Sequence, residues 1–324
     1  MQSLEFYQKE FISHLEDQKL IKEPKSLYAP IDYILNLGGK RLRPVLTLIA
    51  CELFGVDYRK ALPTAMAVEV FHNFSLVHDD IMDDAPLRRG QLTVHEKWNV
   101  NTGILSGDAM LINSYEYFEG YEANILKQLF LVFNKTAIEV CVGQQYDMDF
   151  ESRTDVVISE YLKMIEYKTS VLIGAALKMG AIVAGASEKD QDHLYEFGKN
   201  LGIAFQLQDD FLDAFGDPES FGKQVGGDII ENKKTFLYLK ALELGSGRDQ
   251  KKLLDYFDNQ PQDPSEKVEA VKKMFKRIGS DRATMAEIEK YTHKAFASLS
   301  KIDASENGKR LLRQLGENLM RRSN

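Results

Sequence analysis

The sequence predicts an all-α protein, a single large helical bundle, and two observations support this. Eight prolines occur in 324 residues, and none lies between Pro86 and Pro218, where an α/β chain would need frequent turns. Within that stretch apolar residues recur at helical spacing, and no Asn-Gly turn separates alternating runs as in a β-hairpin. No linker is evident. We therefore expect about ten or more helices in one domain covering residues 1–324.

Individual helices can be located from their spacing and their ends. One face of a predicted helix runs through residues 161–176. Its members are Tyr161, Met164, Ile165, Lys168, Leu172, Ala175 and Ala176. Farther along, Pro264 and Ser265 predict the start of a helix over residues 266–278.

The end of that helix is also predicted. Gly279 is expected to terminate it, since glycine is favoured just beyond a helix C-terminus. Ser280 or Asp281 is expected to cap the next helix, which runs to about Ser300. The polar residues 245–266 predict a loop.

Composition excludes several classes of protein. Lysine and arginine number 41 against 49 aspartates and glutamates, so the net charge is −8. Proteins that bind duplexes usually carry a basic excess, and nucleic acid is therefore not expected as a partner. Apolar residues make up 44% and charged residues 28%, which excludes a disordered chain.

The sequence also predicts where the protein resides. Cys51 and Cys141 lie far apart with no CxxC pair, and we expect them to be core thiols in a reduced compartment. The first residues carry charges where a signal peptide would need apolar ones. The most apolar stretch, residues 171–186, is too short for a membrane span and contains Lys178. We expect a cytoplasmic protein without stable membrane insertion.

A five-residue acidic segment occurs twice. It reads DDIMD at residues 79–83 and DDFLD at residues 209–213, and each copy follows an apolar run that is expected to be helical. On a helix, the first and last Asp of each copy share a face, and the second Asp lies beside them. Aspartate is a poor helix former, and like charges four residues apart repel. The repeated DDxxD pattern therefore indicates a function other than helix stability.

Crowded carboxylates on a partly buried face repel one another unless cations neutralise them. Hard oxygen ligands suit Mg²⁺, which leaves positions for water and substrate phosphates. The candidate metal ligands are Asp79, Asp80, Asp83, Asp209, Asp210 and Asp213. Two alternatives are a solvated acidic face and a di-iron site. The second would need two Glu-x-x-His pairs, and only Glu69 and His72 form one.

Basic residues flank both acidic copies in compact clusters, as a diphosphate site would require. The clusters are Lys40, Arg41 and Arg43 after Gly38-Gly39; Arg88 and Arg89 before Gly90; Lys168 beside Thr169; and Lys223, Lys233 and Lys234 around Gly226-Gly227. Each cluster alone could be a set of surface charges. Together they favour a phosphate site.

With these motifs in this order, the sequence resembles the trans-isoprenyl diphosphate synthase (polyprenyl synthetase) family, in particular its short-chain farnesyl and geranylgeranyl members. The motifs that carry the resemblance are GGKRLRP at 38–44, HNFSLVHDDIMDDAPLRRG at 72–90, LSGDAML at 105–111, GQQYDMD at 143–149, YKTS at 167–170, FQLQDDFLDAFGD at 205–217, FGKQVGGD at 221–228 and NKKT at 232–235. The resemblance implies an isoprenoid-synthase type bundle around a central cleft lined by the two DDxxD helices.

The resemblance also implies a set of metal ligands. Asp79 and Asp83 would hold two Mg²⁺ ions, with Asp80 in support. Asp209 would hold a third ion, with Asp210 and Asp213 around it.

The substrate contacts follow from the same resemblance. Arg88, Lys168, Lys233 and Lys223 would grip the allylic diphosphate. Lys40, Arg43, His72 and Arg89 would bind isopentenyl diphosphate. Thr169 and Gln206 would face the developing carbocation, and His78 is expected only to make an orienting hydrogen bond.

The implied reaction is chain elongation by a prenyltransferase. The allylic carbon–oxygen bond ionises, the isopentenyl double bond attacks the cation, and the departed diphosphate takes the proton, so no side-chain base is required. A class I terpene cyclase is an alternative, but it usually lacks the second DDxxD and the GGKRLRP segment. A non-catalytic partner subunit is another, and it would be expected to have lost motif residues.

Product length is expected to depend on two residues before the first acidic motif. Ser75 lies one helical turn before Asp79, and Phe74 is its neighbour. In the family, aromatic residues at both positions accompany fifteen-carbon products, and an aromatic only at the farther one accompanies twenty carbons. The resemblance thus favours geranylgeranyl diphosphate, with farnesyl diphosphate as the close alternative. It also implies a homodimer. The basic residues 321–324 are either a family tail or a solvated helix end.

Overall fold

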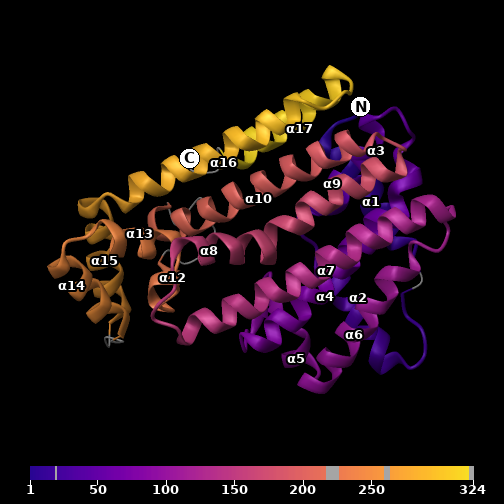
Figure 1. The fold of residues 1–324 in the computed structure, drawn as a ribbon. Coiled ribbons are helices and arrows are strands. Elements are labelled where there is room, and N and C mark those ends of the chain that lie inside the picture. Colours follow the sequence, from indigo (N-terminus) through magenta and orange to yellow (C-terminus); the bar gives the residue numbers. More distant parts are fainter. Residues whose placement is uncertain (19, 217–225, 259–262, 321–324) are drawn as a thin grey trace. The chain divides into compact units, whose positions relative to one another are not determined.

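The computed structural model describes residues 1–18, 20–216, 226–258 and 263–320. Within those ranges the chain is built almost entirely of helices, which confirms the predicted all-α class (Figure 1). The strands in the described part are β1 (Leu87–Arg88) and β2 (Gln91–Leu92), which form one antiparallel pair. Lys223 and the basic residues 321–324 lie outside the described residues.

The chain divides into two compact units, each assembled from separate stretches of sequence. Unit 1 comprises Met1–Lys135, Leu172–Tyr195 and Ile302–Leu311. Unit 2 comprises Thr136–Val171, Glu196–Lys301 and Leu312–Asn324. Four unit boundaries fall inside helices, namely α7 (Ala123–Ser152), α9 (Val171–Val183), α10 (Glu188–Phe215) and α17 (Glu306–Met320). The fifth lies between residues 301 and 302, in the connection from α16 (Ser280–Ser300) to α17. The predicted organisation as one domain stays a prediction.

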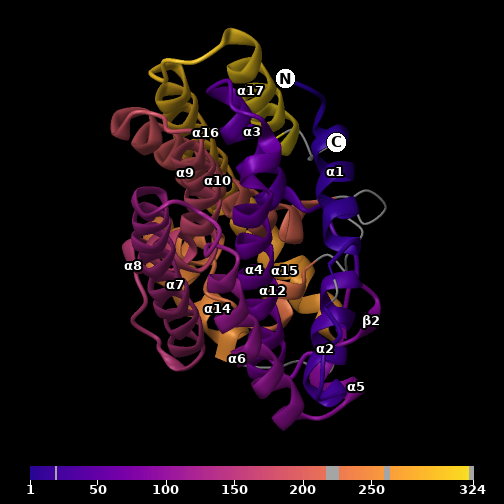
Figure 2. The ribbon, with the colours of Figure 1, turned by 90° about the vertical axis from the view of Figure 1, so that its right-hand side faces the viewer.

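Unit 1 holds the first acidic motif. Its elements are α1 (Leu4–Glu16), α2 (Lys25–Asn36), α3 (Leu42–Leu53), η1 (Tyr58–Ala61), α4 (Leu62–Met82), β1, β2, α5 (Val94–Lys97), α6 (Val100–Glu116), α9 (Val171–Val183) and the first parts of α7 (Ala123–Ser152), α10 (Glu188–Phe215) and α17 (Glu306–Met320). Helices α4 and α6 pack along each other (Figure 2). Their approach depends on glycine, because a Cβ on Gly107 would lie 2.2 Å from His78 Nε2.

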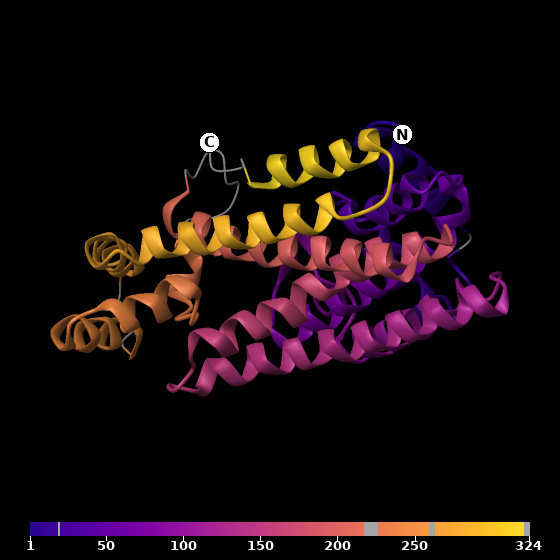
Figure 3. The same cartoon turned by 45° about the horizontal axis from the view of Figure 1, so that its top comes forward.

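Unit 2 holds the second acidic motif. Its elements are the remaining parts of α7, α10 and α17, with α8 (Ile158–Ile165), η2 (Glu166–Ser170), α12 (Gly227–Ile230), α13 (Phe236–Leu244), α14 (Gly247–Asp258), α15 (Pro264–Ile278) and α16 (Ser280–Ser300). The long α16 packs against α13 and α15 (Figure 3). The apolar core of unit 2 includes Tyr161, Leu207, Phe236, Leu253 and Phe275.

The helix predicted from Pro264 is confirmed as α15, and Gly279 ends it with a left-handed φ of 90°. The next helix runs over Ser280–Ser300, as expected. The predicted cap is wrong, however, because Gly279 itself is the N-cap residue and no side chain makes the capping hydrogen bond. The predicted helix face at residues 161–176 is confirmed as buried or half-buried, but its middle is a π turn, η2.

Three other expectations were wrong. The polar residues 245–266 were expected to be a loop but contain α14, whose buried residues Leu253 and Phe257 are four positions apart. The β1–β2 hairpin was not anticipated, because its strands are too short to alternate and its turn uses Arg89 and Gly90 at positive φ. Cys141 is exposed on α7 rather than in the core, while Cys51 is buried as expected.

The expectation about membranes can be compared with helix length and hydropathy. Among the described residues, none of the helices combines the length and the apolar character that crossing a bilayer would require.

Candidate functional site

The first acidic motif occupies the last turn of α4, where Asp83 is the C-cap residue. The Asp80 side chain is 1% exposed and is held by a guanidinium, with Arg88 Nε 2.9 and 2.8 Å from its two carboxylate oxygens. Arg88 Nη2 lies 2.7 Å from Asp80 Oδ1 and 3.6 Å from Asp79 Oδ2. Burial raises the pKa of Asp80, and Arg88 opposes that shift. The short hairpin is what returns Arg88 to the end of α4.

A cluster of basic groups lies on the same unit. Arg43 Nη1 is 3.1 Å from His72 Nε2, and because a guanidinium can only donate, the imidazole nitrogen accepts and the ring is neutral. Burial and the charge of Arg43 lower the pKa of His72 well below its usual value. Burial also lowers the pKa of Arg43 to about 10 and, with Arg41, lowers that of Arg89. An anion would relieve this repulsion between neighbouring cations.

The glycine pair before these cations has a steric role. Arg89 donates a hydrogen bond to the Gly38 carbonyl, and a Cβ on Gly39 would lie 2.8 Å from Arg89 Cζ. Gly39 also has a φ of 119°, a backbone conformation that favours glycine. The exposed Lys40 follows directly. The absence of a Cβ at Gly39 therefore lets the Arg89 guanidinium lie against the loop.

The residues expected to limit chain length lie one to two turns before the motif. Phe74 is buried, with its ring centroid 5.5 Å from Phe71 and 4.9 Å from His78. Ser75 is half-buried and donates a hydrogen bond to the His72 carbonyl at 2.8 Å. His78 Nε2 donates to the Ile104 carbonyl at 3.2 Å, as the expected orienting bond requires.

The second acidic motif lies on α10 in unit 2, and its buried member is Asp210. Tyr161 donates its hydroxyl to Asp210, and Gln206 Nε2 donates at 3.1 Å. Thr169 Oγ1 in turn lies 3.4 Å from Gln206 Oε1, to which it donates. Asp213 Oδ1 accepts from the Asp228 backbone N–H at 3.0 Å. Two predicted contacts to the reacting centre, Thr169 and Gln206, are thus joined to this motif by hydrogen bonds.

Two lysines of unit 2 are paired with carboxylates outside the motif. Lys168 Nζ lies 2.6 Å from Asp147 Oδ2. Lys233 Nζ lies 2.9 Å from Glu231 and 3.8 Å from Asp228. Both side chains are partly exposed, so an incoming anion can compete for them.

The donor set of the second motif fits a hard divalent cation. Burial raises the pKa of Asp210 and of Asp228. Nearby carboxylates add to the effect, Asp209 and Asp213 for Asp210, and Asp210 and Asp213 for Asp228. Carboxylates that are desolvated and close together are stabilised by a cation of high charge with oxygen preference, such as Mg²⁺. Sequence reasoning assigned no role to Tyr161 or Asp147, although both lie in segments it had singled out.

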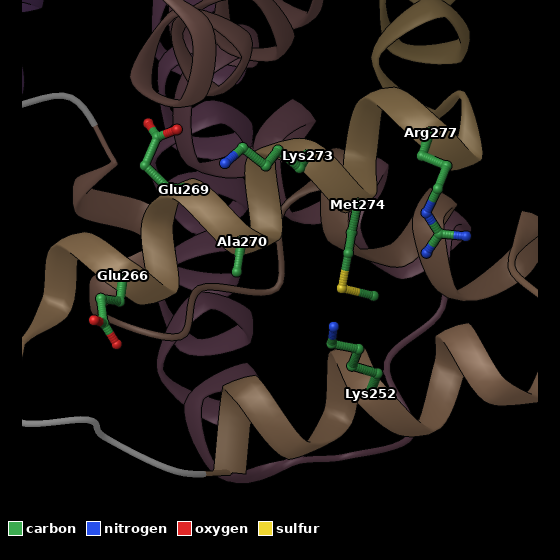
Figure 4. A pocket seen from close by; sticks show the side chains of 7 residues that line it. All are labelled: Lys252, Glu266, Glu269, Ala270, Lys273, Met274 and Arg277. Atoms are coloured by element: carbon green, nitrogen blue, oxygen red, sulfur yellow. The ribbon is translucent and has the colours of Figure 1, made fainter.

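A pocket of about 490 Å³ lies between α14 and α15 in unit 2 (Figure 4). Its walls carry charges of both signs around Ala270 and Met274. The lining residues are Lys252, Glu266, Glu269, Ala270, Lys273, Met274 and Arg277. None of them is a predicted site residue, and we assign no function to this pocket.

The chain is similar to known proteins in sequence and in fold. A family model for polyprenyl synthetase matches residues 24–274. A geranylgeranyl diphosphate synthase from Methanosarcina mazei is 44% identical over 69% of this chain and 70% of its own. A geranylfarnesyl diphosphate synthase from Natronomonas pharaonis is 39% identical over 71% of this chain and 73% of its own. A crystal structure of geranylgeranyl pyrophosphate synthase covers 100% of both chains with a TM-score of 0.95 and 51% identity.

Proposed function

The chain belongs to the polyprenyl synthetase family and is a trans-prenyltransferase, and on that premise we propose that it condenses isopentenyl diphosphate with allylic diphosphates in a Mg²⁺-dependent reaction. The observation that carries the proposal is the coexistence of two unlike sites. One is the basic cluster of Arg43, His72 and Arg89, and the other kind is an acidic motif, present once in each unit and with one buried Asp in each copy. A prenyltransferase needs both, because one diphosphate leaves and the other stays attached to the product.

The basic cluster is proposed to bind isopentenyl diphosphate. Burial lowers the pKa of Arg43 and of Arg89, and a neighbouring guanidinium lowers it further in each case, that of Arg89 for Arg43 and that of Arg41 for Arg89. A bound anion would offset both effects. His72 is neutral with its proton on Nδ1, so it contributes a hydrogen-bond donor without a further charge. Lys40 adds an exposed ammonium beside the glycine pair.

The allylic diphosphate is proposed to be held by Arg88, Lys168, Lys223 and Lys233, and by about three Mg²⁺ ions. Asp79, Asp83 and Asp209 would hold these ions, with Asp80, Asp210 and Asp213 in support. When bound, Mg²⁺ neutralises the charge that develops on the leaving diphosphate. Arg88 and Lys168 would supply further positive charge at the same oxygens.

Thr169 and Gln206 are proposed to face the allylic carbon as it ionises. The Thr169 hydroxyl donates to Gln206 Oε1, while the Gln206 amide donates to Asp210. This chain of bonds fixes the direction of both side-chain dipoles before the substrate arrives. Oxygen lone pairs fixed in this way can stabilise positive charge without acting as nucleophiles. The proton lost from the isopentenyl unit would go to the departed diphosphate.

A turnover assay tests the proposal against its two alternatives. The purified protein is incubated with radiolabelled isopentenyl diphosphate, Mg²⁺ and allylic diphosphates of five, ten and fifteen carbons. We expect labelled, longer prenyl diphosphates. Release of hydrocarbon and free diphosphate without uptake of label would support a terpene cyclase. No consumption of either substrate would indicate a non-catalytic partner subunit.

We further propose that the main product is geranylgeranyl diphosphate, with farnesyl diphosphate as the close alternative. The proposal is supported by the large buried ring of Phe74 and the small, half-buried side chain of Ser75. The growing chain would pass Ser75 and be stopped by Phe74. Two of the relatives are named for twenty-carbon and twenty-five-carbon products, so similarity alone leaves the length open.

The product-length proposal is tested by a pair of opposite substitutions. Phe74→Ala removes the ring and should lengthen the product by one or more five-carbon units, since the vacated volume admits more chain. Ser75→Phe should shorten it toward farnesyl diphosphate. Phe118→Leu is the matched control, because it trims another buried aromatic side chain of unit 1. Chromatography of dephosphorylated products gives the lengths. An unchanged distribution in an active Phe74→Ala enzyme would show that Phe74 is not the floor.

A homodimer is proposed from exposed apolar residues at helical spacing. Leu105 and Ile112 on α6 are 60% and 65% exposed, and Leu131 and Ile138 on α7 are 61% and 66% exposed. Each pair is seven residues apart and so lies on one side of its helix. Light scattering coupled to size exclusion should give twice the chain mass. Ile112→Lys should reduce it to one chain, and a monomeric wild type would contradict the proposal.

A cytoplasmic location is also proposed. Cys51 and Cys141 are both free thiols, as expected for a reducing compartment. Fractionation of cells that express the full chain tests this location, and recovery from an oxidising compartment would contradict it.

A further inference from the structure

The β1–β2 hairpin closes a short loop that returns the chain to the end of α4. Thr93 Oγ1 donates to the Ala85 carbonyl at 2.8 Å, and the Thr93 backbone N–H donates to the Pro86 carbonyl at 3.2 Å. The Ala85 backbone N–H in turn donates to the Asp80 carbonyl at 2.9 Å. These bonds hold Ala85 and Thr93 together at the base of the loop, and we call this base the neck. The residues that flank the neck in the sequence on either side therefore lie close together. Those residues are Asp84 on one side and His95 and Glu96 of α5 on the other.

His95 is placed in this neck in an unusual state. Its side chain is 4% exposed, yet among the described residues neither ring nitrogen has a hydrogen-bond partner. Its Nε2 lies 3.8 Å from Glu96 Oε1, which is too long for a hydrogen bond. One ligand atom each from Asp84, His95 and Glu96 lies within 4.8 Å of the others. The buried His95 imidazole therefore faces two carboxylates but has no hydrogen-bond partner among the described residues. A bound ion would give its ring nitrogen a partner.

We propose that Asp84, His95 and Glu96 form a binding site for a Zn²⁺-class transition-metal ion, separate from the Mg²⁺ ligands of the acidic motif. Imidazole with carboxylates suits Zn²⁺ and its neighbours, whereas Mg²⁺ favours oxygen ligands. Ligand atoms around a tetrahedral Zn²⁺ lie about 3.3 Å apart. Reaching that spacing requires only small movements, because Asp84 and Glu96 are both exposed. Three protein ligands leave a fourth position for water.

A metal ion bound at this site would affect the hairpin that lies between its ligands. The hairpin between Asp84 and His95 bears Arg88 and Arg89. An ion that joins the end of α4 to α5 would clamp both ends of this hairpin. The site therefore would fix the two guanidiniums in place whether or not any substrate is bound. The proposal does not depend on the proposed reaction.

Calorimetric titration with ZnCl₂ tests the site in the full-length protein, with MgCl₂ in large excess to occupy oxygen-only sites. We expect the wild type to bind one Zn²⁺ that Mg²⁺ does not displace. Asp84→Asn and Glu96→Gln should each weaken that binding at least tenfold. Both side chains are exposed, so neither variant is expected to lose its fold. Glu119→Gln, which removes another exposed carboxylate of unit 1, is the matched control and should bind as the wild type does.

Two further measurements separate this site from the acidic motif. Asp79→Asn should retain the Zn²⁺ affinity of the wild type, because Asp79 is not among the proposed ligands. X-ray absorption of the Zn²⁺-loaded protein should show one imidazole ligand. The proposal is overturned if Asp84→Asn and Glu96→Gln bind Zn²⁺ as tightly as the wild type. It is also overturned if Asp79→Asn alone abolishes binding, or if the bound ion shows no imidazole.

Discussion

Asp80 of unit 1 and Asp210 of unit 2 hold the same place in the two acidic motifs, yet they are stabilised in different ways. Asp80 is bound by a guanidinium at 2.8–2.9 Å from both of its oxygens. Asp210 is bound by the neutral Tyr161 hydroxyl and the neutral Gln206 amide. Each carboxylate is buried, so each needs hydrogen bonds. Arg88 gives Asp80 those bonds together with a countercharge.

The difference shows what each acidic motif still requires. Hydrogen bonds from neutral donors orient a carboxylate but do not compensate its negative charge. Nearby Asp228 adds to the negative potential around Asp210. The second motif therefore has more to gain from an added cation than the first. The first motif is in large part organised by the protein alone. Four experiments can break or sharpen this comparison.

The largest effect is expected from removing one metal-binding carboxylate from each motif. Asp79→Ala and Asp209→Ala should each lower kcat by about a hundredfold or more, because charge stabilisation in the transition state is lost. Steady-state turnover with isopentenyl and allylic diphosphates measures this, and circular dichroism checks the fold. Asp17→Ala in unit 1 and Asp258→Ala in unit 2 remove exposed carboxylates as controls. Near-normal rates in both motif variants would contradict the site assignment.

The next effect separates a charged partner from a neutral one. Arg88→Ala leaves Asp80 buried without its countercharge and should lower the free energy of unfolding by about 3 kcal/mol or more. Tyr161→Phe removes one hydrogen bond to Asp210 and should cost about 1.5 kcal/mol. Urea denaturation of both variants and the wild type gives the two values. If Tyr161→Phe proved as damaging as Arg88→Ala, the contrast between the motifs would be wrong.

A smaller effect is expected from added Mg²⁺ without substrate. An ion that binds only the folded protein stabilises it by about 2.7 kcal/mol at a hundred times its Kd. We expect Mg²⁺ to raise the Tm of the wild type and of Asp79→Asn by a few degrees. The rise should be smaller in Asp209→Asn, because the less compensated motif is altered. NaCl at matched ionic strength is the control. The reverse order of the two variants would refute the comparison.

The smallest effect is expected from a surface ion pair, between the exposed Arg277 and the half-buried Asp249. Arg277 Nη2 lies 2.6 Å from Asp249 Oδ1, and its hydrogen bond lowers the pKa of Asp249 from 3.8 to about 2. The stabilisation is therefore complete above about pH 4 and is lost as the pH falls toward 2. Asp249→Asn should differ from the wild type in urea midpoint at pH 6, and the difference should disappear at low pH. A constant difference would exclude this ionisation as its cause.

The motifs could be predicted from the sequence because their chemistry conflicts with helix propensity. Two DDxxD copies in apolar helices are costly, and basic clusters around them indicate what offsets the cost. The partners of each carboxylate could not be predicted. Tyr161 reaches Asp210 across 49 residues of sequence, and Arg88 reaches Asp80 only because of a hairpin with two-residue strands. Such partners depend on packing between elements that no local pattern encodes.

Element boundaries differed from expectation where composition was a poor guide. Helix α14 is mostly polar, and only Leu253 and Phe257 are buried. Their spacing of four residues was the available signal, but two residues are too few to outweigh a polar stretch. The exposed Cys141 was mistaken for a core residue for a related reason, since a single thiol carries no periodicity.

The π turn η2 has a consequence for how this chain can vary in length. A π turn amounts to one extra residue inserted into a helix, and here it contains both Lys168 and Thr169. Gly143 of α7 packs against it so closely that a Cβ would lie 2.2 Å from the Lys168 backbone nitrogen. Deleting one residue within Glu166–Ser170 would restore a regular α-helix and rotate the preceding segment by about 100° relative to α9. A homologue that lacks the residue at Glu166 would keep the YKTS residue types, but the side chains of its α8, Tyr161 among them, would face a different side relative to α9.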